Sequence, residues 1–276
     1  MATINNPSFF CTDFSTGLLY DNSSNKFASN LYSWDKKELK LESNNSTFYV
    51  YVHEGSTLIK SSLHDNYKHP FVLTKRMYLC SSGSLTIVGG KGIVMERMNY
   101  TNSLFQIGGP IGGKGKYKYI DGCSDSLIIP PVKLGDPCLN ALYFPKGINQ
   151  TEHTHPSMRV GMVTYGSGWC ITPWEEIPLY EGQIFLIHEG HKETFDTGEG
   201  AIGDEVKHNG IMGIKGAHSF RTEDSGMCVI AYHPDSDFGP TDDEHPMINR
   251  TIVGGKRANE QTEIRTKKIH EELWAS

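Results

Sequence analysis

Short strand-like segments separated by turn residues run through this chain from Thr47 onward. The first of them, residues 47–55, is rich in aromatic and β-branched residues in alternation, as expected for a β-strand. Similar segments, separated by Gly, Ser and Asn, follow at residues 71–80, 84–88, 92–98 and 104–107. Short strands at this spacing favour a sandwich or a barrel. The 29 glycines and the absence of long apolar runs support the same all-β interpretation.

Composition excludes several classes of function. A net charge of −6 gives the chain no global basic surface for nucleic acid. No window approaches the roughly 18 apolar residues of a membrane-spanning helix. The N-terminus lacks the basic and apolar regions of a signal peptide, so we expect a cytoplasmic protein. The six cysteines are scattered without a C-x-x-C pair, which disfavours zinc-finger and thioredoxin chemistry and indicates reduced thiols.

Two histidines one residue apart, His153 and His155, give the first indication of a site. Residues i and i+2 of a β-strand point to the same face, so both imidazoles would face one cavity from one strand. Neutral imidazole is the commonest protein ligand for divalent transition metals. Apolar residues follow at positions 160–163, and we expect Gly166 and Gly168 to end this strand. The pattern predicts a metal held inside a β-barrel, whereas an isolated pair of this kind would indicate solvent-facing or hydrogen-bonded histidines.

The stretch from Gly147 to Gly166 resembles the first motif of the cupin superfamily, G-x5-H-x-H-x3,4-E-x6-G, with every spacing kept. Arg159 stands where that family has a glutamate ligand, and a protonated guanidinium cannot ligate a metal. Some cupins, such as those resembling cysteine dioxygenase or gentisate dioxygenase, use three histidines and no glutamate. Arg159 would then hold a substrate carboxylate in a bidentate fork; a structural or surface ion pair is the alternative.

The resemblance leaves two positions for the third ligand. Gly182 and Gly190 match the start of the second cupin motif, which places Glu193 at its histidine position. Residues 210–232 resemble the end of the same motif after an insertion of about twenty residues. There His218 follows a turn and precedes a hairpin and a strong strand. We expect His218 to complete the site; Glu193 would then be a fourth ligand, a general base or an exposed charge, and His191 is a further candidate.

The resemblance implies an all-β fold of double-stranded β-helix (cupin) barrels, arranged as two tandem halves with a C-terminal helix. Residues 1–46 would form an N-terminal arm, and residues 47–125 a degenerate cupin half without metal ligands. The half that carries the metal site would span residues 126–250. A helical tail would follow at residues 251–276, where residues 258–274 have an amphipathic pattern.

The same resemblance implies a mononuclear non-haem iron(II) dioxygenase, an oxidoreductase acting on a small anionic organic substrate. Manganese, nickel and zinc suit the same ligands. Arg159 and Glu193 are the candidate catalytic residues, and Tyr165, Trp169 and Phe220 are candidate pocket walls. A metal-dependent lyase or isomerase, a metal-free cupin similar to sugar epimerases and a small-molecule-binding protein remain as alternatives. We expect a homodimer with no nucleic-acid or membrane partner.

Overall fold

The computed structural model describes residues 3–64, 66, 69–133, 135–190 and 204–235, and the backbone of residues 252–253 and 256–257. The chain divides into two compact units, Met1–Ser236 and Asp237–Ser276. In the described part of the chain, every regular element is a β-strand except two short 3-10 helices, Ser62–His64 and Ile120–Gly122. None of the helices in that part is long and apolar enough to cross a membrane. The predicted all-β class is therefore confirmed.

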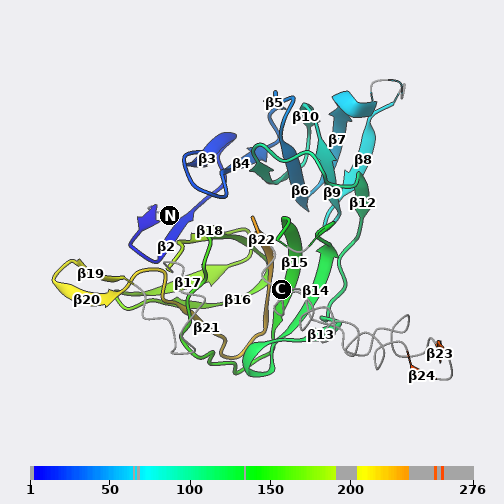
Figure 1. Cartoon of the computed structure of the whole chain (residues 1–276). Helices are drawn as coiled ribbons and strands as arrows, with labels where there is room; N and C mark the ends of the chain where they lie inside the picture. Colours follow the sequence, from blue (N-terminus) through cyan, green and yellow to red (C-terminus); the bar gives the residue numbers. More distant parts are fainter. Residues whose placement is uncertain are drawn as a thin grey trace, which may run out of the picture. The chain divides into compact units, whose positions relative to one another are not determined.

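Two sheets make up the first half of the larger unit (Figure 1). The six-stranded sheet has the order β12 (Gln106–Gly108), β9 (Tyr78–Ser82), β6 (Thr47–Glu54), β11 (Lys91–Arg97), β4 (Ser29–Asp35) and β3 (Gly17–Asn22). The four-stranded sheet has the order β5 (Leu39–Leu41), β10 (Leu85–Val88), β7 (Ser56–Ser61) and β8 (Phe71–Thr74). Apolar side chains from both sheets, such as Trp34, Val50 and Ile87, pack into one buried cluster. No described group of metal-ligating side chains lies in this half.

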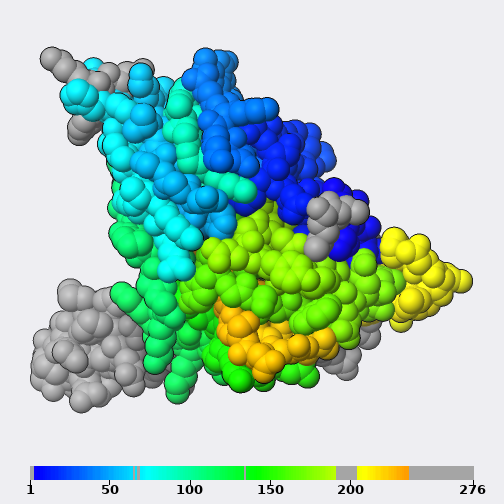
Figure 2. Space-filling view, turned by 180° about the vertical axis from the view of Figure 1, so that it is seen from behind, coloured from blue at the N-terminus to red at the C-terminus, as the bar shows by residue number. Residues whose placement is uncertain are grey.

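A ten-stranded sheet forms the second half. Its main path is β1 (Ile4–Asn5), β2 (Phe9–Thr12), β18 (Ile184–Ile187), β16 (Arg159–Ile171), β22 (Met227–His233), β15 (Cys138–Phe144), β14 (Ser124–Ile129) and β13 (Tyr117–Lys118). Two further strands pair with β16, namely β17 (Glu176–Tyr180) and β21 (Ser219–Arg221). The hairpin of β19 (Glu205–His208) and β20 (Ile211–Ile214) projects from the body and is yellow in Figure 2.

Strand β22 shows how strand alternation divides the core. Ile230 and Tyr232 join a cluster that also holds Tyr49 and Tyr51 of β6, so this cluster joins the two halves. The alternate residue Val229 faces a second cluster inside the second half. Because successive side chains of a strand point to opposite faces, one strand serves both clusters. The sheet around β22 therefore separates the contact with the first half from the interior of the second barrel.

The course of β16 differs from the sequence-based expectation. The strand does not end at Gly166 and Gly168 but continues to Ile171. A bulge between Val163 and Tyr165 and a positive φ of 77° at Gly166 bend it, so that its second part leaves β18 and pairs with β17 and β21. Glycine adopts this left-handed conformation without the steric cost of a Cβ. The glycine that was expected to stop the strand redirects it instead.

Residues 1–46, which the sequence assigned to an arm, supply the five strands β1–β5. Strand β2 pairs with β18 of the second half, whereas β3, β4 and β5 pair within the sheets of the first half. This segment thus contributes to both halves. In the smaller unit, β23 (Ile252–Val253) and β24 (Lys256–Arg257) form an antiparallel pair. The helix expected at residues 258–274 lies outside the described residues, and the boundaries at residues 125 and 250 stay predictions.

Candidate metal centre

Three histidines come together in the second half: His153, His155 and His218. The sequence placed the first two on a strand, and this was wrong. Strand β16 begins only at Arg159, and His153 forms an isolated antiparallel bridge with His218. Two backbone hydrogen bonds of 3.0 Å join these two residues, one from each amide nitrogen to the other carbonyl oxygen. The bridge fixes the third histidine opposite the first two without a continuous strand.

The three imidazoles are close enough to share one ion. Their ring centroids lie 4.5 to 5.1 Å apart. One nitrogen of each ring can be chosen such that all three nitrogens lie within 4.8 Å of one another. Tetrahedral or octahedral coordination at metal–nitrogen distances of about 2.0–2.1 Å places ligand atoms about 3 to 4 Å apart. Small rotations of the rings therefore suffice for coordination.

Backbone carbonyls orient two of the rings. The Nδ1 atom of His153 lies 2.9 Å from the carbonyl oxygen of Thr151, and Nδ1 of His218 lies 2.9 Å from that of Gly216. A carbonyl only accepts hydrogen bonds, so each Nδ1 carries the proton and each Nε2 keeps a free lone pair. Nε2 of His218 is buried and has no hydrogen-bond partner among the described residues. A buried nitrogen without a partner is costly, and a bound metal ion would satisfy it.

Burial keeps His155 and His218 neutral. Burial is the largest cause that lowers the pKa of His218 to about 3, with the charge of His153 adding to it. Burial and the neighbouring Arg159 guanidinium hold the pKa of His155 well below its ordinary value. Metal binding requires the unprotonated imidazole, so both histidines are in the binding-competent form at neutral pH. Their donor set suits iron, manganese, nickel or zinc.

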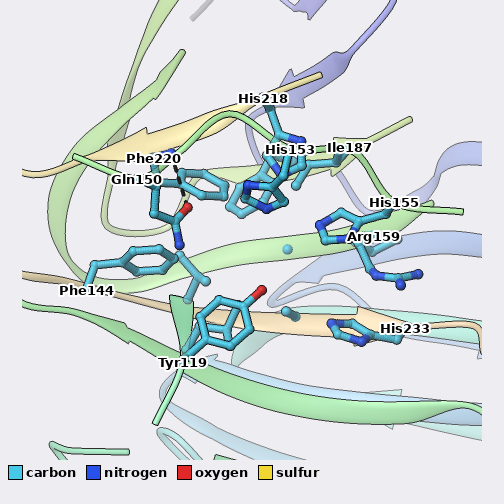
Figure 3. Close-up of a pocket in the computed structure, with 16 residues that line it drawn as sticks. Tyr119, Phe144, Gln150, His153, His155, Arg159, Ile187, His218, Phe220 and His233 are labelled. Atoms are coloured by element: carbon cyan, nitrogen blue, oxygen red, sulfur yellow. Dashed lines mark hydrogen bonds between the residues drawn. The ribbon is translucent and has the colours of Figure 1, made fainter. Parts of the chain in front are cut away.

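The histidines line a pocket of about 400 Å³, including its mouth. Figure 3 shows His153 and His218 side by side, with Tyr119 across the cavity turning its hydroxyl toward it. Apolar side chains form much of the remaining wall, namely Leu142, Phe144, Val160, Phe185, Ile187, Phe220, Val229 and Ala231. Gly161 makes room for one of them, because a Cβ there would lie 2.2 Å from the Phe185 ring. The three histidines thus occupy a largely apolar cavity.

Arg159 lines this pocket and is buried. Its Nη1 atom lies 3.2 Å from an Asp235 carboxylate oxygen, and both side chains bond the Ser157 hydroxyl. Asp235 therefore offsets the charge of Arg159 at the end of the cavity near His233. The ion pair expected as an alternative at Arg159 exists, and it is buried rather than exposed. Its role toward a substrate stays a prediction.

Sequence reasoning missed three polar residues of the pocket: Tyr119, Gln150 and His233. Burial and the charge of Arg159 hold the pKa of His233 well below its ordinary value. Gln150 is buried and accepts a hydrogen bond from the Phe220 amide at 3.3 Å. His233 directly follows the strand predicted at residues 227–232. Because alternate residues of a strand share a face, His233 could have been predicted to point into the barrel together with Ala231. No comparable signal marks Tyr119 or Gln150.

The remaining candidates have mixed outcomes. Phe220 lines the pocket, as expected, whereas Tyr165 and Trp169 are not among its described lining residues. The hydroxyl of Tyr165 instead donates to the carbonyl oxygen of Gly113 at 3.2 Å, and Trp169 stacks under the Arg221 guanidinium. Glu193 and His191 lie outside the described residues, so their roles stay predictions.

No protein-family model and no curated protein matches this sequence. Among solved structures, the chain is similar to a glyoxylate induced protein from Pseudomonas aeruginosa. The TM-score is 0.51 at 12% identity, covering 86% of this chain and 85% of that one. It is also similar to a cupin 2 conserved barrel domain protein from Leptotrichia buccalis (TM-score 0.48, 12% identity, 83% and 85% covered). A third similar structure is salicylate 1,2-dioxygenase from Pseudaminobacter salicylatoxidans. Its TM-score is 0.46 at 9% identity, covering 82% of this chain and 71% of that one.

These likenesses concern the fold. The fold of the chain is like that of these structures, one of which is named as a cupin barrel domain protein. Its second half carries a three-histidine cluster that could hold a metal ion. Identities this low leave the chemistry of the site to be argued from its own residues.

Proposed function

We propose that this protein is a mononuclear metal-dependent oxidoreductase, an iron(II) dioxygenase acting on a small anionic organic substrate. The observation that carries the proposal is the set of three imidazole nitrogens within 4.8 Å of one another, one of them a buried nitrogen without a described partner. Three neutral ligands leave coordination positions open for substrate and solvent. When bound, a ferrous ion would supply the redox chemistry that dioxygen requires.

The apolar wall around the histidines supports chemistry in a dry cavity. Phe144, Phe185 and Phe220 surround the space beside the ligands and limit the access of water. Excluding water strengthens electrostatic contacts and prevents side reactions of reactive intermediates. A substrate would place its apolar part against these rings and its anionic group toward Arg159.

No carboxylate is among the described residues that line this pocket. A lyase or isomerase that removes a proton would need a base there, and His233 is the described candidate outside the ligand set. The lyase therefore depends on His233 or Glu193 as its base, whereas the oxidoreductase needs neither. Glu193 keeps the lyase testable, since its carboxylate would supply that base.

Metal analysis of protein purified without chelator tests the proposal. We expect close to one iron per chain in the wild type and loss of most of it in His155→Ala and His218→Ala. Glu193→Ala should retain the metal if three histidines form the site. A wild-type protein that holds no metal and cannot be loaded with Fe, Mn, Ni or Zn would overturn the metal site. If metal binds but no substrate causes oxygen uptake, while turnover occurs without oxygen, the lyase or isomerase replaces the dioxygenase.

A further inference from the structure

A second pocket, of about 350 Å³ including its mouth, lies outside the metal centre. The N-terminal segment and the strand β18 region enclose it together. Unlike the metal pocket, it is lined mainly by polar side chains. Its described lining residues are Tyr20, Asn22, Asn25, Met158, Leu186, His188, Glu189 and Lys215.

This second pocket combines one cationic and one anionic side chain with two amides. The Glu189 carboxylate accepts a hydrogen bond from Asn25 Nδ2 at 3.1 Å, which leaves its other oxygen available. The Asn22 amide meets the Met158 sulfur at 3.1 Å, a weak acceptor that leaves most of its hydrogen-bonding capacity unused. The Lys215 ammonium has no ion-pair partner among the described residues. The described lining residues therefore offer one positive and one negative contact, and their charges cancel.

The two pockets lie on opposite faces of the same sheet. Ile187 lines the metal pocket, whereas its strand neighbours Leu186 and His188 line the second pocket. Likewise, Arg159 lines the metal pocket, whereas its neighbour Met158 lines the second pocket. Alternation along strands explains this division, because successive side chains point to opposite faces.

Two glycines connect the pockets. The Gly190 amide donates to the His155 carbonyl oxygen at 3.0 Å, and Gly190 directly follows Glu189. The Gly216 carbonyl accepts from His218 Nδ1 at 2.9 Å, and Gly216 directly follows Lys215. The glycines also touch, since a Cβ on Gly216 would lie 2.7 Å from the Gly190 Cα. A ligand that moves Glu189 or Lys215 would therefore move the groups that hold two of the three histidines.

We propose that the second pocket binds a free α-amino acid and that this binding changes the affinity of the three histidines for their metal. The carboxylate of the zwitterion would pair with Lys215, and its ammonium with Glu189. The amides of Asn22 and Asn25 would bond the remaining polar atoms. A zwitterion matches a neutral pocket with separated charges better than a simple anion, which would leave Glu189 unpaired. The effect on the metal rests on the proposed function, whereas the binding does not.

Calorimetry on the full chain without metal tests the binding. The probes are L-alanine, L-serine and L-glutamine, with L-lactate and 2-amino-1-propanol as analogues of alanine that each lack one charge. We expect at least one amino acid to bind more tightly than both analogues. Glu189→Gln and Lys215→Met should each weaken it about tenfold or more, because each removes a charge-assisted hydrogen bond. Lys207→Met, an exposed lysine on the β19–β20 hairpin, should leave the affinity unchanged.

Binding of no amino acid, binding that both pocket variants leave intact, or equal binding of the single-charge analogues would overturn the assignment. A Ni²⁺ titration with and without the amino acid then tests the connection, and the same titrations on Lys215→Met correct for chelation of Ni²⁺ by the free amino acid. We expect the Ni²⁺ affinity to change at least about threefold, and the amino-acid affinity to change by the same factor when Ni²⁺ is present. Unchanged Ni²⁺ affinity overturns the connection alone. A chain that binds the amino acid but no metal refutes the proposed function and leaves the second site standing.

Discussion

At the scale of single residues, Gly216 joins two requirements of the metal centre. Its φ of 75° is a left-handed conformation that side chains rarely adopt, and its carbonyl oxygen holds the His218 ring. A Cβ at this position would lie 2.7 Å from backbone atoms of Gly190 and His188. Backbone atoms cannot move aside as a flexible side chain can. The residue therefore fixes both the close approach of two segments and the direction of one ligand.

Replacing Gly216 with alanine should destabilise the protein and weaken metal binding. The matched control is Gly210→Ala, since Gly210 has a φ of 85° but nothing within 4 Å of an added Cβ. The control should lose about 1–2 kcal/mol from the left-handed conformation alone. Gly216→Ala should lose a further amount of about 1–3 kcal/mol from overpacking. Urea unfolding of both variants measures the difference, and equal losses would show that the contact with Gly190 is unimportant.

The resemblance to the two cupin motifs was enough to single out the three histidines that cluster. His153 and His155 followed from the spacing of one motif, and His218 from the turn before it and the strand after it. The partner of Arg159 could not be found in this way, because Asp235 lies 76 positions further along the chain. Nothing local in the sequence favours that pair over other acidic residues. The same holds for Tyr119, which enters the pocket from the segment between β13 and β14.

At the scale of elements, strand β2 attaches the N-terminal segment to the sheet of the second half. It pairs with β18 from Phe9↔Ile187 to Thr12↔Ile184. The Phe9 ring stacks on that of Phe185, a wall of the metal pocket, with centroids 5.3 Å apart. The strand therefore covers the edge of β18 and supports the pocket from behind. An arm that merely rested on the surface would make neither contact.

Phe9→Ala should cost about 3–5 kcal/mol of unfolding free energy, the usual range for a fully buried phenylalanine. Leu18→Ala is the control from the same segment, because Leu18 is 52% exposed and should lose less than about 1 kcal/mol. Chemical denaturation followed by tryptophan fluorescence distinguishes the two. A small loss in Phe9→Ala would mean that the segment behaves as the detachable arm expected from the sequence.

Strand existence was easier to predict than strand pairing. Residues 138–144 and 227–232 show continuous apolar and β-branched patterns and do form β15 and β22. The polar and Asn-rich residues 1–46 lack such a pattern, and their strands depend on partners far along the chain. Pairing between β2 and β18 spans more than 170 positions. Tertiary contacts of this range override local propensity and leave no local trace.

At the scale of the whole molecule, the two halves differ in what fills their interiors. Trp34, Ile59 and Leu79 belong to the apolar core of the first half. The second half keeps its cavity open around three histidines. The joint cluster that contains Tyr49 and Tyr232 packs the two halves against each other. The sequence indicated this difference between the halves, since the pattern His-x-His occurs only in the second half.

Because the two halves share a core, a metal bound in the second half should stabilise both. At a free metal concentration of 100 times the dissociation constant, binding to the folded state alone adds about 2.7 kcal/mol. For a folded unit of this size, that corresponds to a rise of about 5–10 °C in Tm. Calorimetry with Ni²⁺ should show this shift in a single transition for the wild type, and excess chelator should reverse it. His155→Ala should show almost none of it. A shift of equal size in that variant would mean that the metal acts at another site, and two separate transitions would mean that the halves unfold independently.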